Sequence, residues 1–278
     1  MAPSGSLRPH RPWLGSSAAR RGVGVGLRIA VAGKGGAGKT TVCALLAGIL
    51  SRAGHRVLLV DLDSDPNLAA ALGFPPEAGR PIVHRKELIA ERTGSTGEPG
   101  GMFLLNPNVS DIAEKFALRR TEGVYLLPVG TIEAAGEGCF CPQAAFVKAL
   151  VRRLVLGKEE DLVLDLEAGL ESFGRAVVEG LDLLWIVVEP GMRSLDTARR
   201  ILGMASSLGV RNVRVVANKV RPESRDAVAR ALRETGIAMD LVLPFREELA
   251  RRDLEGIGVF DFTDPVFEAE ALQAIRSI

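Results

Sequence analysis

The chain has 278 residues, of which 47% are hydrophobic and 25% are charged, and its formal net charge is +1. This composition is ordinary for one folded domain with a sizeable core. The balanced charge creates no long-range field, so neither nucleic acid nor a membrane surface is expected as a partner. No apolar stretch reaches the roughly 18 residues that span a bilayer. Three cysteines are too few for a disulfide framework, which favours a reducing cytoplasmic location.

Residues 1–26 differ from the rest of the chain. They are rich in arginine, serine, proline and glycine and contain no acidic residue. They lack the apolar run of roughly 7–15 residues that a secretory signal carries. A transit peptide shares this composition, and an incorrectly assigned start codon is another explanation. We expect a disordered N-terminal extension over residues 1–26 and a single domain over residues 27–278.

Short apolar runs alternate with helical patterns along the rest of the chain, which predicts an α/β fold with an open, mostly parallel twisted sheet and helices on both faces. The runs are continuously apolar, as in strands buried on both sides. The predicted strands are 28–32, 56–60, 124–128, 162–166, 183–188, 213–217 and 241–243. The predicted helices are 39–52, 144–156, 194–208, 223–234 and 246–252, and glycines expected to end three of them are Gly54, Gly209 and Gly236.

The stretch from Gly73 to Thr121 interrupts this alternation. It is punctuated by glycine and proline and is too long for a bare connection in a compact domain. We interpret it as a functional insertion with a short helix at residues 81–92.

An anion-binding loop joins the first predicted strand to the first predicted helix. Residues 33–40 read Gly-Lys-Gly-Gly-Ala-Gly-Lys-Thr and match the phosphate-loop pattern. Its glycines let backbone N–H groups turn toward a phosphate, and the following helix directs its positive end to the same place. We expect Lys39 to reach the β- and γ-phosphates of ATP and the Thr40 hydroxyl to bind Mg²⁺. The predicted nucleotide-binding residues of the loop are Gly33, Lys34, Gly35, Gly36, Ala37, Gly38, Lys39, Thr40 and Thr41.

Acidic residues end two of the predicted strands. Asp61 and Asp63 follow the second strand, where α/β proteins place ligand-binding groups, and they suit a magnesium-bound water and an attacking water. Asp165 ends the fourth strand and fits a carboxylate that binds Mg²⁺ through its water shell. Asp65 and Asn67 are short polar residues that favour a cap on the following helix.

The loop resembles that of the deviant Walker A ATPases, a family that includes the nitrogenase iron protein, MinD and ParA. Its signature is the additional lysine, here Lys34, which in the family crosses a dimer interface and contacts the partner's nucleotide. The resemblance implies a homodimer, with Lys34 acting like an arginine finger in trans. It also implies that Asp63 is a switch residue needed for hydrolysis. The family reads adenine with an asparagine, here Asn218 next to Lys219, and Pro244 and Phe245 would then lie beside the purine.

Two cysteines, Cys139 and Cys141, form a C-x-C pair. One pair supplies two thiolates, whereas a structural site for a soft metal uses four ligands, and a two-fold dimer doubles the count to four. We therefore expect one Ni²⁺ or Zn²⁺ held across the dimer by both pairs. Two thiols that pack in the core or react with oxidants are the alternatives. Cys43 lies among apolar residues of the first helix and is expected in the core.

The chain also resembles the CooC family of nickel-insertion ATPases, which mature carbon monoxide dehydrogenase. The similarity runs from Arg28 to Phe262 and does not include residues 1–26. It rests on the Lys34 loop, the D-x-D-x-D-P-N segment at residues 61–67, and the segments at residues 91–94, 138–142, 165–169 and 189–190. It implies that ATP closes the dimer around nickel, with carbon monoxide dehydrogenase as the client.

Three alternatives remain from the sequence. Acetyl-CoA synthase is a second client of the same chemistry. A positioning ATPase like MinD or ParA would bind membrane or DNA, but residues 263–278 are acidic rather than basic, and the net charge is balanced. A reductase with a bridging iron–sulfur cluster is the third alternative.

Overall fold

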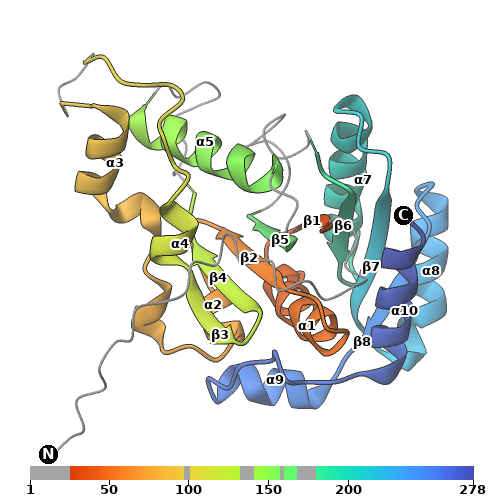
Figure 1. The fold of residues 1–278 in the computed structure, drawn as a ribbon. Helices are drawn as coiled ribbons and strands as arrows, with labels where there is room; N and C mark the ends of the chain where they lie inside the picture. Colours follow the sequence, from red (N-terminus) through yellow and green to blue (C-terminus); the bar gives the residue numbers. More distant parts are fainter. Residues whose placement is uncertain (1–25, 97–100, 132–140, 157–159, 168–179) are drawn as a thin grey trace, which may run out of the picture.

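The computed structural model describes residues 26–96, 101–131, 141–156, 160–167 and 180–278. The predictions for residues 1–25, for Cys139 and for residues 168–169 fall outside these ranges. Within them, eight strands form one sheet in the order β3-β4-β2-β5-β1-β6-β7-β8 (Figure 1). The strands are β1 (Arg28–Gly33), β2 (Val57–Leu62), β3 (Leu118–Thr121), β4 (Val124–Pro128), β5 (Asp161–Leu166), β6 (Leu183–Val188), β7 (Val213–Val220) and β8 (Leu241–Pro244).

The sheet is parallel except for its edge, where β3 pairs antiparallel with β4. From β1 the chain moves to β2, then to the edge strand β3, and comes back through β4 to β5 before it crosses to β6, β7 and β8 on the other side. The strand order therefore reverses beside β1. In open α/β sheets, ligands bind at the carboxyl ends of the strands next to such a reversal.

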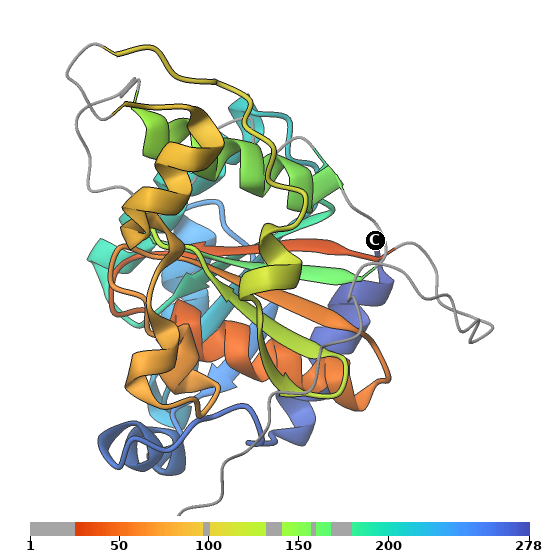
Figure 2. The ribbon, with the colours of Figure 1, turned by 60° about the vertical axis from the view of Figure 1, so that its left-hand side comes forward.

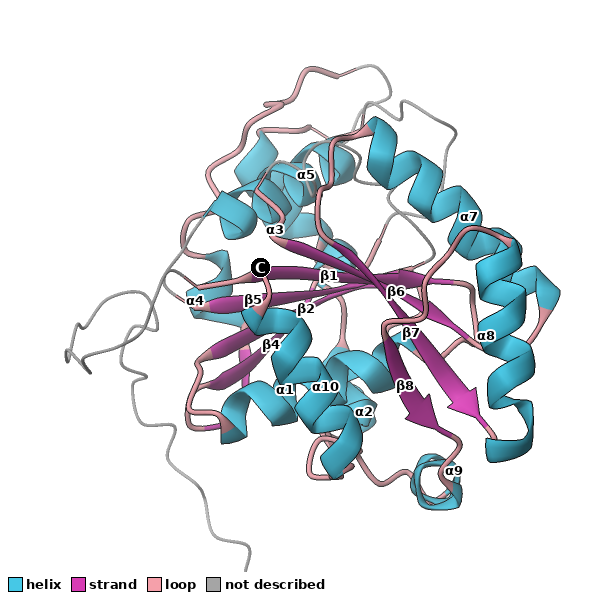
Figure 3. Cartoon of the chain, turned by 90° about the vertical axis from the view of Figure 1, so that its right-hand side faces the viewer, coloured by secondary structure: helices cyan, strands magenta, loops and turns pink. Residues whose placement is uncertain are grey.

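Helices cover both faces of this sheet (Figures 2 and 3). One face packs against α3, α4, α5, α7 and α8. The other packs against α1, α2 and α10, with α9 at its margin. The helices are α1 (Lys39–Arg52), α2 (Leu68–Ala71), α3 (Lys86–Thr93), α4 (Ile112–Phe116), α5 (Pro142–Leu156), α7 (Met192–Ser207), α8 (Arg225–Glu234), α9 (Glu247–Leu254) and α10 (Pro265–Arg276).

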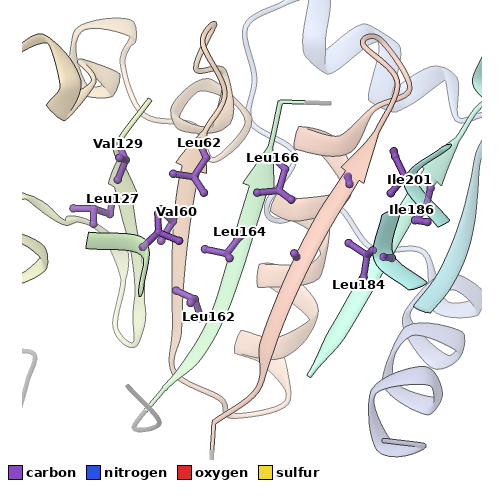
Figure 4. Close-up of a cluster of buried hydrophobic side chains, with 14 of the residues drawn as sticks. Val60, Leu62, Leu127, Val129, Leu162, Leu164, Leu166, Leu184, Ile186 and Ile201 are labelled. Carbon is purple, nitrogen blue, oxygen red and sulfur yellow. The ribbon is translucent and has the colours of Figure 1, made fainter. Parts of the chain in front are cut away.

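Two apolar cores explain why the strands are continuously apolar. In β2, Leu58, Val60 and Leu62 lie in the core beneath α5 and α7, whereas Val57 and Leu59 lie in the core beneath α1. Figure 4 shows the first of these cores, where side chains from β2, β5 and β6 meet. Alternate residues therefore face opposite helical layers, and both sets must be hydrophobic.

The insertion between Gly73 and Thr121 contains short helices and an edge strand rather than a bare loop. The expectation of a helix beginning at residue 81 is wrong, because residues 82–84 form a 3-10 turn and α3 begins at Lys86. The N–H of Val83 donates to the carbonyl of Val129 (3.1 Å), which ties this turn to the end of β4. A bidentate ion pair between Arg92 and Asp111, with both distances 2.8 Å, connects α3 to the segment before α4.

Several local predictions are confirmed. Gly54, Gly209 and Gly236 follow α1, α7 and α8 with φ values of 87°, 81° and 75°.

None of the helices in the described residues is long and apolar enough to cross a membrane.

Candidate functional site

The phosphate loop lies between the end of β1 and the start of α1, against β6 and β7. A Cβ on Gly33 would lie 2.3 Å from the carbonyl oxygen of Val187, and one on Gly38 would lie 2.2 Å from Nδ2 of Asn218. Both glycines have positive φ, 151° and 93°. These two positions require glycine, because any side chain would push the loop away from the neighbouring strands.

The end of β7 holds this loop from the side. Nδ2 of Asn218 donates to the carbonyl oxygen of Ala37 (2.8 Å), and Oδ1 accepts from the N–H of Lys219 (2.8 Å). The Nζ of Lys219 donates to the carbonyl of Gly36 (2.6 Å). A side-chain amide has two N–H groups and two lone pairs, so one of each remains for a ligand. The structure places Asn218 against the phosphate loop, and its contact with adenine stays a prediction.

Two buried carboxylates lie below the loop. Asp61 and Asp165 are in register on the neighbouring strands β2 and β5. Burial raises the pKa of Asp61, and the Asp165 carboxylate raises it further. Burial also raises the pKa of Asp165, although Thr40 and Lys39 act in the opposite direction. Both groups are therefore held in an environment that disfavours two negative charges.

The two carboxylates differ in their hydrogen bonds. Asp61 accepts from the N–H groups of Asp63 (3.1 Å) and Leu68 (3.0 Å). Both oxygens of Asp165 are buried and accept no hydrogen bond of normal geometry from the described residues, although the Thr40 hydroxyl and the Cys43 thiol lie near enough to lower its pKa. A buried carboxylate without a partner is costly, and hard cations prefer such oxygen ligands. The donor set around Asp165 and Thr40 therefore fits Mg²⁺.

The remaining loop residues surround this position. Lys39 is the first residue of α1 and is buried, and Thr40 and Thr41 follow it as half-buried residues. Cys43, one turn further along the helix, is fully buried, which confirms its place in the core. Burial and the Asp165 and Asp61 carboxylates raise the pKa of its thiol.

Asp63 is half-buried directly after β2, and its Oδ1 accepts from the N–H of Asp65 (3.0 Å). The expectation that Asp65 or Asn67 caps α2 is wrong. Nδ2 of Asn67 donates to the carbonyl of Asp65 (2.8 Å), while Asp61 takes the first N–H of the helix, that of Leu68. Asp61 takes this N–H because its position near the end of β2 brings its Oδ2 within 3.0 Å of the start of the helix.

Lys34 folds back over its own chain. Its Nζ lies 3.4 Å from Oε1 of Glu189, the residue that follows β6. The sequence motifs do not predict a role for Glu189, which belongs only to one of the segments that carry the family resemblance. The missed signal is an acidic residue directly after a continuous apolar strand, the same signal that identified Asp165.

Pro244 is the last residue of β8, next to β7, and Phe245 follows it. The N–H of Phe245 donates to the carbonyl of Val220 (3.0 Å), and the Arg221 guanidinium carbon lies 4.2 Å from the centre of the Phe245 ring. A cavity of about 440 Å³ opens beside Phe245, between the start of α9 and the segment before α10. The predicted nucleoside-binding residues thus come from adjacent strand ends.

Cys141 is half-buried directly before α5. Its Sγ accepts from the N–H of Ala144 (3.4 Å), as a residue at a helix start does. A helix N-terminus favours a negative ligand. Cys139 lies outside the described residues, and in the described part of one chain no three His, Cys, Asp or Glu side chains gather as a metal-binding group.

Comparison with known proteins agrees with this geometry. The profile of the CobQ/CobB/MinD/ParA nucleotide binding domain matches residues 29–259. The chain belongs to this family. It is an ATPase, because the family's phosphate loop and strand-end carboxylates are present at the carboxyl edge of its sheet.

Relatives place this ATPase in a narrower group. It is 40% identical over 242 residues to the carbon monoxide dehydrogenase accessory protein CooC of Rhodospirillum rubrum, covering 85% of this chain and 90% of that one. It is 38% identical to an uncharacterized ATP-binding protein of Methanocaldococcus jannaschii, covering 83% of this chain and 90% of that one. The ATPase is therefore a CooC-type member of the MinD/ParA superfamily.

Solved structures show the fold of the ATPase. The MinD cell division protein of Aquifex aeolicus, in complex with MinC, superposes with a TM-score of 0.62 at 23% identity, covering 90% of this chain and 94% of that one. A ParA family ATPase from Chlorobium tepidum gives 0.64 at 18% identity, with 89% and 98% covered. The predicted α/β phosphate-loop fold is confirmed.

Proposed function

We propose that this ATPase is a nickel metallochaperone that works as a homodimer in the cytoplasm and serves the maturation of carbon monoxide dehydrogenase. Its relative at 40% identity is named an accessory protein of that enzyme. A MinD relative from Thermotoga maritima is 26% identical over 197 residues. The higher identity to the accessory protein favours the accessory role over a positioning role. The observation that carries the proposal is the position of Cys141 at the start of α5, two residues after a second cysteine.

In this proposal, the phosphate loop binds ATP. Backbone N–H groups of residues 33–38 and the side chain of Lys39 bind the phosphates, because they present positive ends toward the carboxyl edge of the sheet. Thr40 and, through a water, Asp165 would hold Mg²⁺. When bound, that ion neutralises charge on the phosphate oxygens. Asn218, Lys219, Pro244 and Phe245 form the nucleoside end.

Hydrolysis depends on two side chains of opposite charge. Asp63 is half-buried beside the carboxylate pair, a position from which it orients the attacking water. Lys34 extends from the loop into the partner subunit in the closed dimer, where it offsets charge on the transferred phosphoryl group. The contact between Lys34 of one chain and the ATP bound to the other thus brings the two chains together.

Nickel is the cargo of the closed dimer. Each chain offers Cys139 and Cys141, and the dimer axis is where two pairs make a four-thiolate site. The N–H of Ala144 at the start of α5 donates to Sγ of Cys141 and so holds this sulfur at the beginning of the helix. Such a site also accepts Zn²⁺, because thiolate ligands do not separate the two metals by affinity alone. Hydrolysis opens the dimer and releases the metal to its client.

Metal titration with parallel sedimentation tests this proposal. We expect one Ni²⁺ per two chains and a stronger dimer when metal is present. Metal binding should weaken as pH falls, because the cysteine thiols must lose their protons to bind the metal. The double variant Cys139→Ser, Cys141→Ser should lose this binding. One metal per single chain, or tight binding by the double variant, contradicts the shared site.

A matched control is available in the third cysteine. Cys43→Ala removes a buried thiol that lies outside the pair, so the metal stoichiometry should not change. The client is tested with nickel-free carbon monoxide dehydrogenase, which should gain activity faster with the nickel-loaded ATPase and ATP than with free Ni²⁺. Equal rates contradict the client. The same measurement with acetyl-CoA synthase distinguishes the alternative client.

A further inference from the structure

Glu189 joins two lysines at the tip of the phosphate loop. Its Oε1 lies 3.4 Å from Nζ of Lys34, and its Oε2 lies 3.3 Å from Nζ of Lys219. Nζ of Lys219 also donates to the carbonyl of Gly36 (2.6 Å). One carboxylate thus connects the loop to the ends of both β6 and β7.

The surrounding backbone holds this arrangement in place. The N–H of Glu189 donates to Oγ of Ser194 (3.0 Å), a buried residue in the first turn of α7. Lys219 has a φ of 57° and is the one non-glycine residue with positive φ in the described part of the chain. Such a conformation is strained for a residue with a side chain and persists where neighbouring contacts enforce it. The strained backbone directs the Lys219 side chain toward Gly36 and Glu189.

The contact at Glu189 determines the direction of Lys34. In this single chain the Nζ of Lys34 points to its own β6 end, and its other hydrogen bond is to the carbonyl of Gly35 (3.2 Å). An ammonium group held at this carboxylate cannot also reach a nucleotide in a second subunit. Both side chains are partly exposed, with 35% and 26% of their surfaces accessible, so the pair is weak enough to exchange.

We infer that Glu189 is a positioning residue that holds Lys34 in cis in the free chain and competes with its reach into the partner subunit. This inference rests on the proposed ATP-dependent dimer. When the dimer closes, the ammonium group of Lys34 leaves the carboxylate of Glu189 and contacts the phosphates of the partner's nucleotide. Glu189 keeps Lys219, so the carboxylate stays neutralised after Lys34 leaves. The exchange adds a modest cost to closure, which the phosphates of the partner's nucleotide offset.

The variant Glu189→Gln tests this inference because it keeps the shape of the side chain and removes its charge. In the nucleotide-free protein, the labelling rate of Lys34 by an amine reagent, measured by mass spectrometry against the exposed Lys86, should rise at least about twofold. With a saturating non-hydrolysable ATP analogue, the dimer dissociation constant measured by sedimentation should fall about threefold, as expected for a partly exposed ion pair. Glu223→Gln removes the same charge from an exposed position and should change neither value.

The two measurements separate the possible failures. Unchanged labelling of Lys34 contradicts the cis contact itself, whatever the dimer does. Increased labelling with an equal or weaker dimer contradicts the competition. A parent protein that stays monomeric with the analogue contradicts the dimer of the proposed function and removes the competition with it, while the labelling result still reports on Glu189.

Discussion

The two ends of strand β5 carry the same residue type in opposite circumstances. At its start, Asp161 accepts from the N–H of Leu27 (2.8 Å) and contacts Nδ1 of His55 (2.7 Å), and it helps to offset the buried charge of Arg28. Near its end, Asp165 is fully buried, and in the described part of the chain its oxygens accept no hydrogen bond of normal geometry, with the Thr40 hydroxyl and the Cys43 thiol as nearby side-chain donors. A paired carboxylate contributes to folding, whereas an unpaired one marks a place for a ligand.

The same contrast extends across the sheet. At the amino ends, Asp182 accepts from the backbone N–H of Arg28 (2.8 Å), and the carboxylates of Asp182 and Asp161 offset the buried charge of the Arg28 guanidinium. At the carboxyl ends, Asp61 and Asp165 lie in register and raise the cost of charge on both. The amino edge therefore compensates its own charges, whereas the carboxyl edge leaves negative charge that a cationic ligand would compensate.

The largest expected effect concerns Asp63 at the carboxyl edge. Asp63→Ala should still bind ATP but hydrolyse it on the order of 10²-fold more slowly, because a water-orienting group is lost. Nucleotide affinity and turnover, measured on the same preparation, separate binding from chemistry. Asp65→Ala is the control, since Asp65 lies in the same segment and is exposed. Weak binding with normal turnover per bound ATP would assign Asp63 to binding.

The matched pair Asp165→Asn and Asp161→Asn tests the comparison directly. Without magnesium and nucleotide at pH 7.5, Asp165→Asn should raise the free energy of unfolding by at least about 1.4 kcal/mol, the equivalent of one pKa unit. Asp161→Asn should lower it by about 1–3 kcal/mol, because it weakens buried bonds and leaves Arg28 less compensated. Denaturant unfolding measures both. Asp165→Asn should also lose hydrolysis, and effects of the same sign on stability would refute the contrast.

The smallest effect is the pH dependence of stability without ligands. The raised pKa values of Asp61 and Asp165 mean that the native state keeps protons that the unfolded state releases above about pH 4. The free energy of unfolding should therefore fall between pH 5 and pH 8, less steeply in Asp165→Asn. Arg92 holds the pKa of Asp111 below its usual range, so Asp111 changes the free energy of unfolding only at lower pH. Identical slopes in parent and variant would argue against this account.

Local patterns were enough to predict much of the fold. The bounds of β4, β6 and α1 agree with the sequence predictions, because each is a strongly apolar run with clear ends. The phosphate loop was also readable, since its glycines and lysines have fixed spacing. The edge strand β3 was not predicted, because its sequence, Leu-Arg-Arg-Thr, is half charged and is a strand through pairing with β4.

Helix α10 was missed although its start has a local signal. Asp264 accepts from the N–H of Phe267 (3.2 Å), and Pro265 occupies the first turn, a combination typical of a helix start. The acidic residues of the segment mask the apolar pattern of its buried face. On that face, Phe267 packs edge to face against Trp185 with ring centres 6.4 Å apart. This helix completes the core beneath the sheet.

The amino-acid sequence is sufficient to identify the chemical groups that the chain offers: a phosphate loop, strand-end carboxylates and a cysteine pair. Which of the described groups lie together depends on the fold. Lys34 and Glu189 are 155 residues apart in the chain, and Asp61 rather than Asp65 or Asn67 takes the first N–H of α2. The physical reason is the strand order, since parallel strands distant in sequence bring their carboxyl ends to one edge of the sheet.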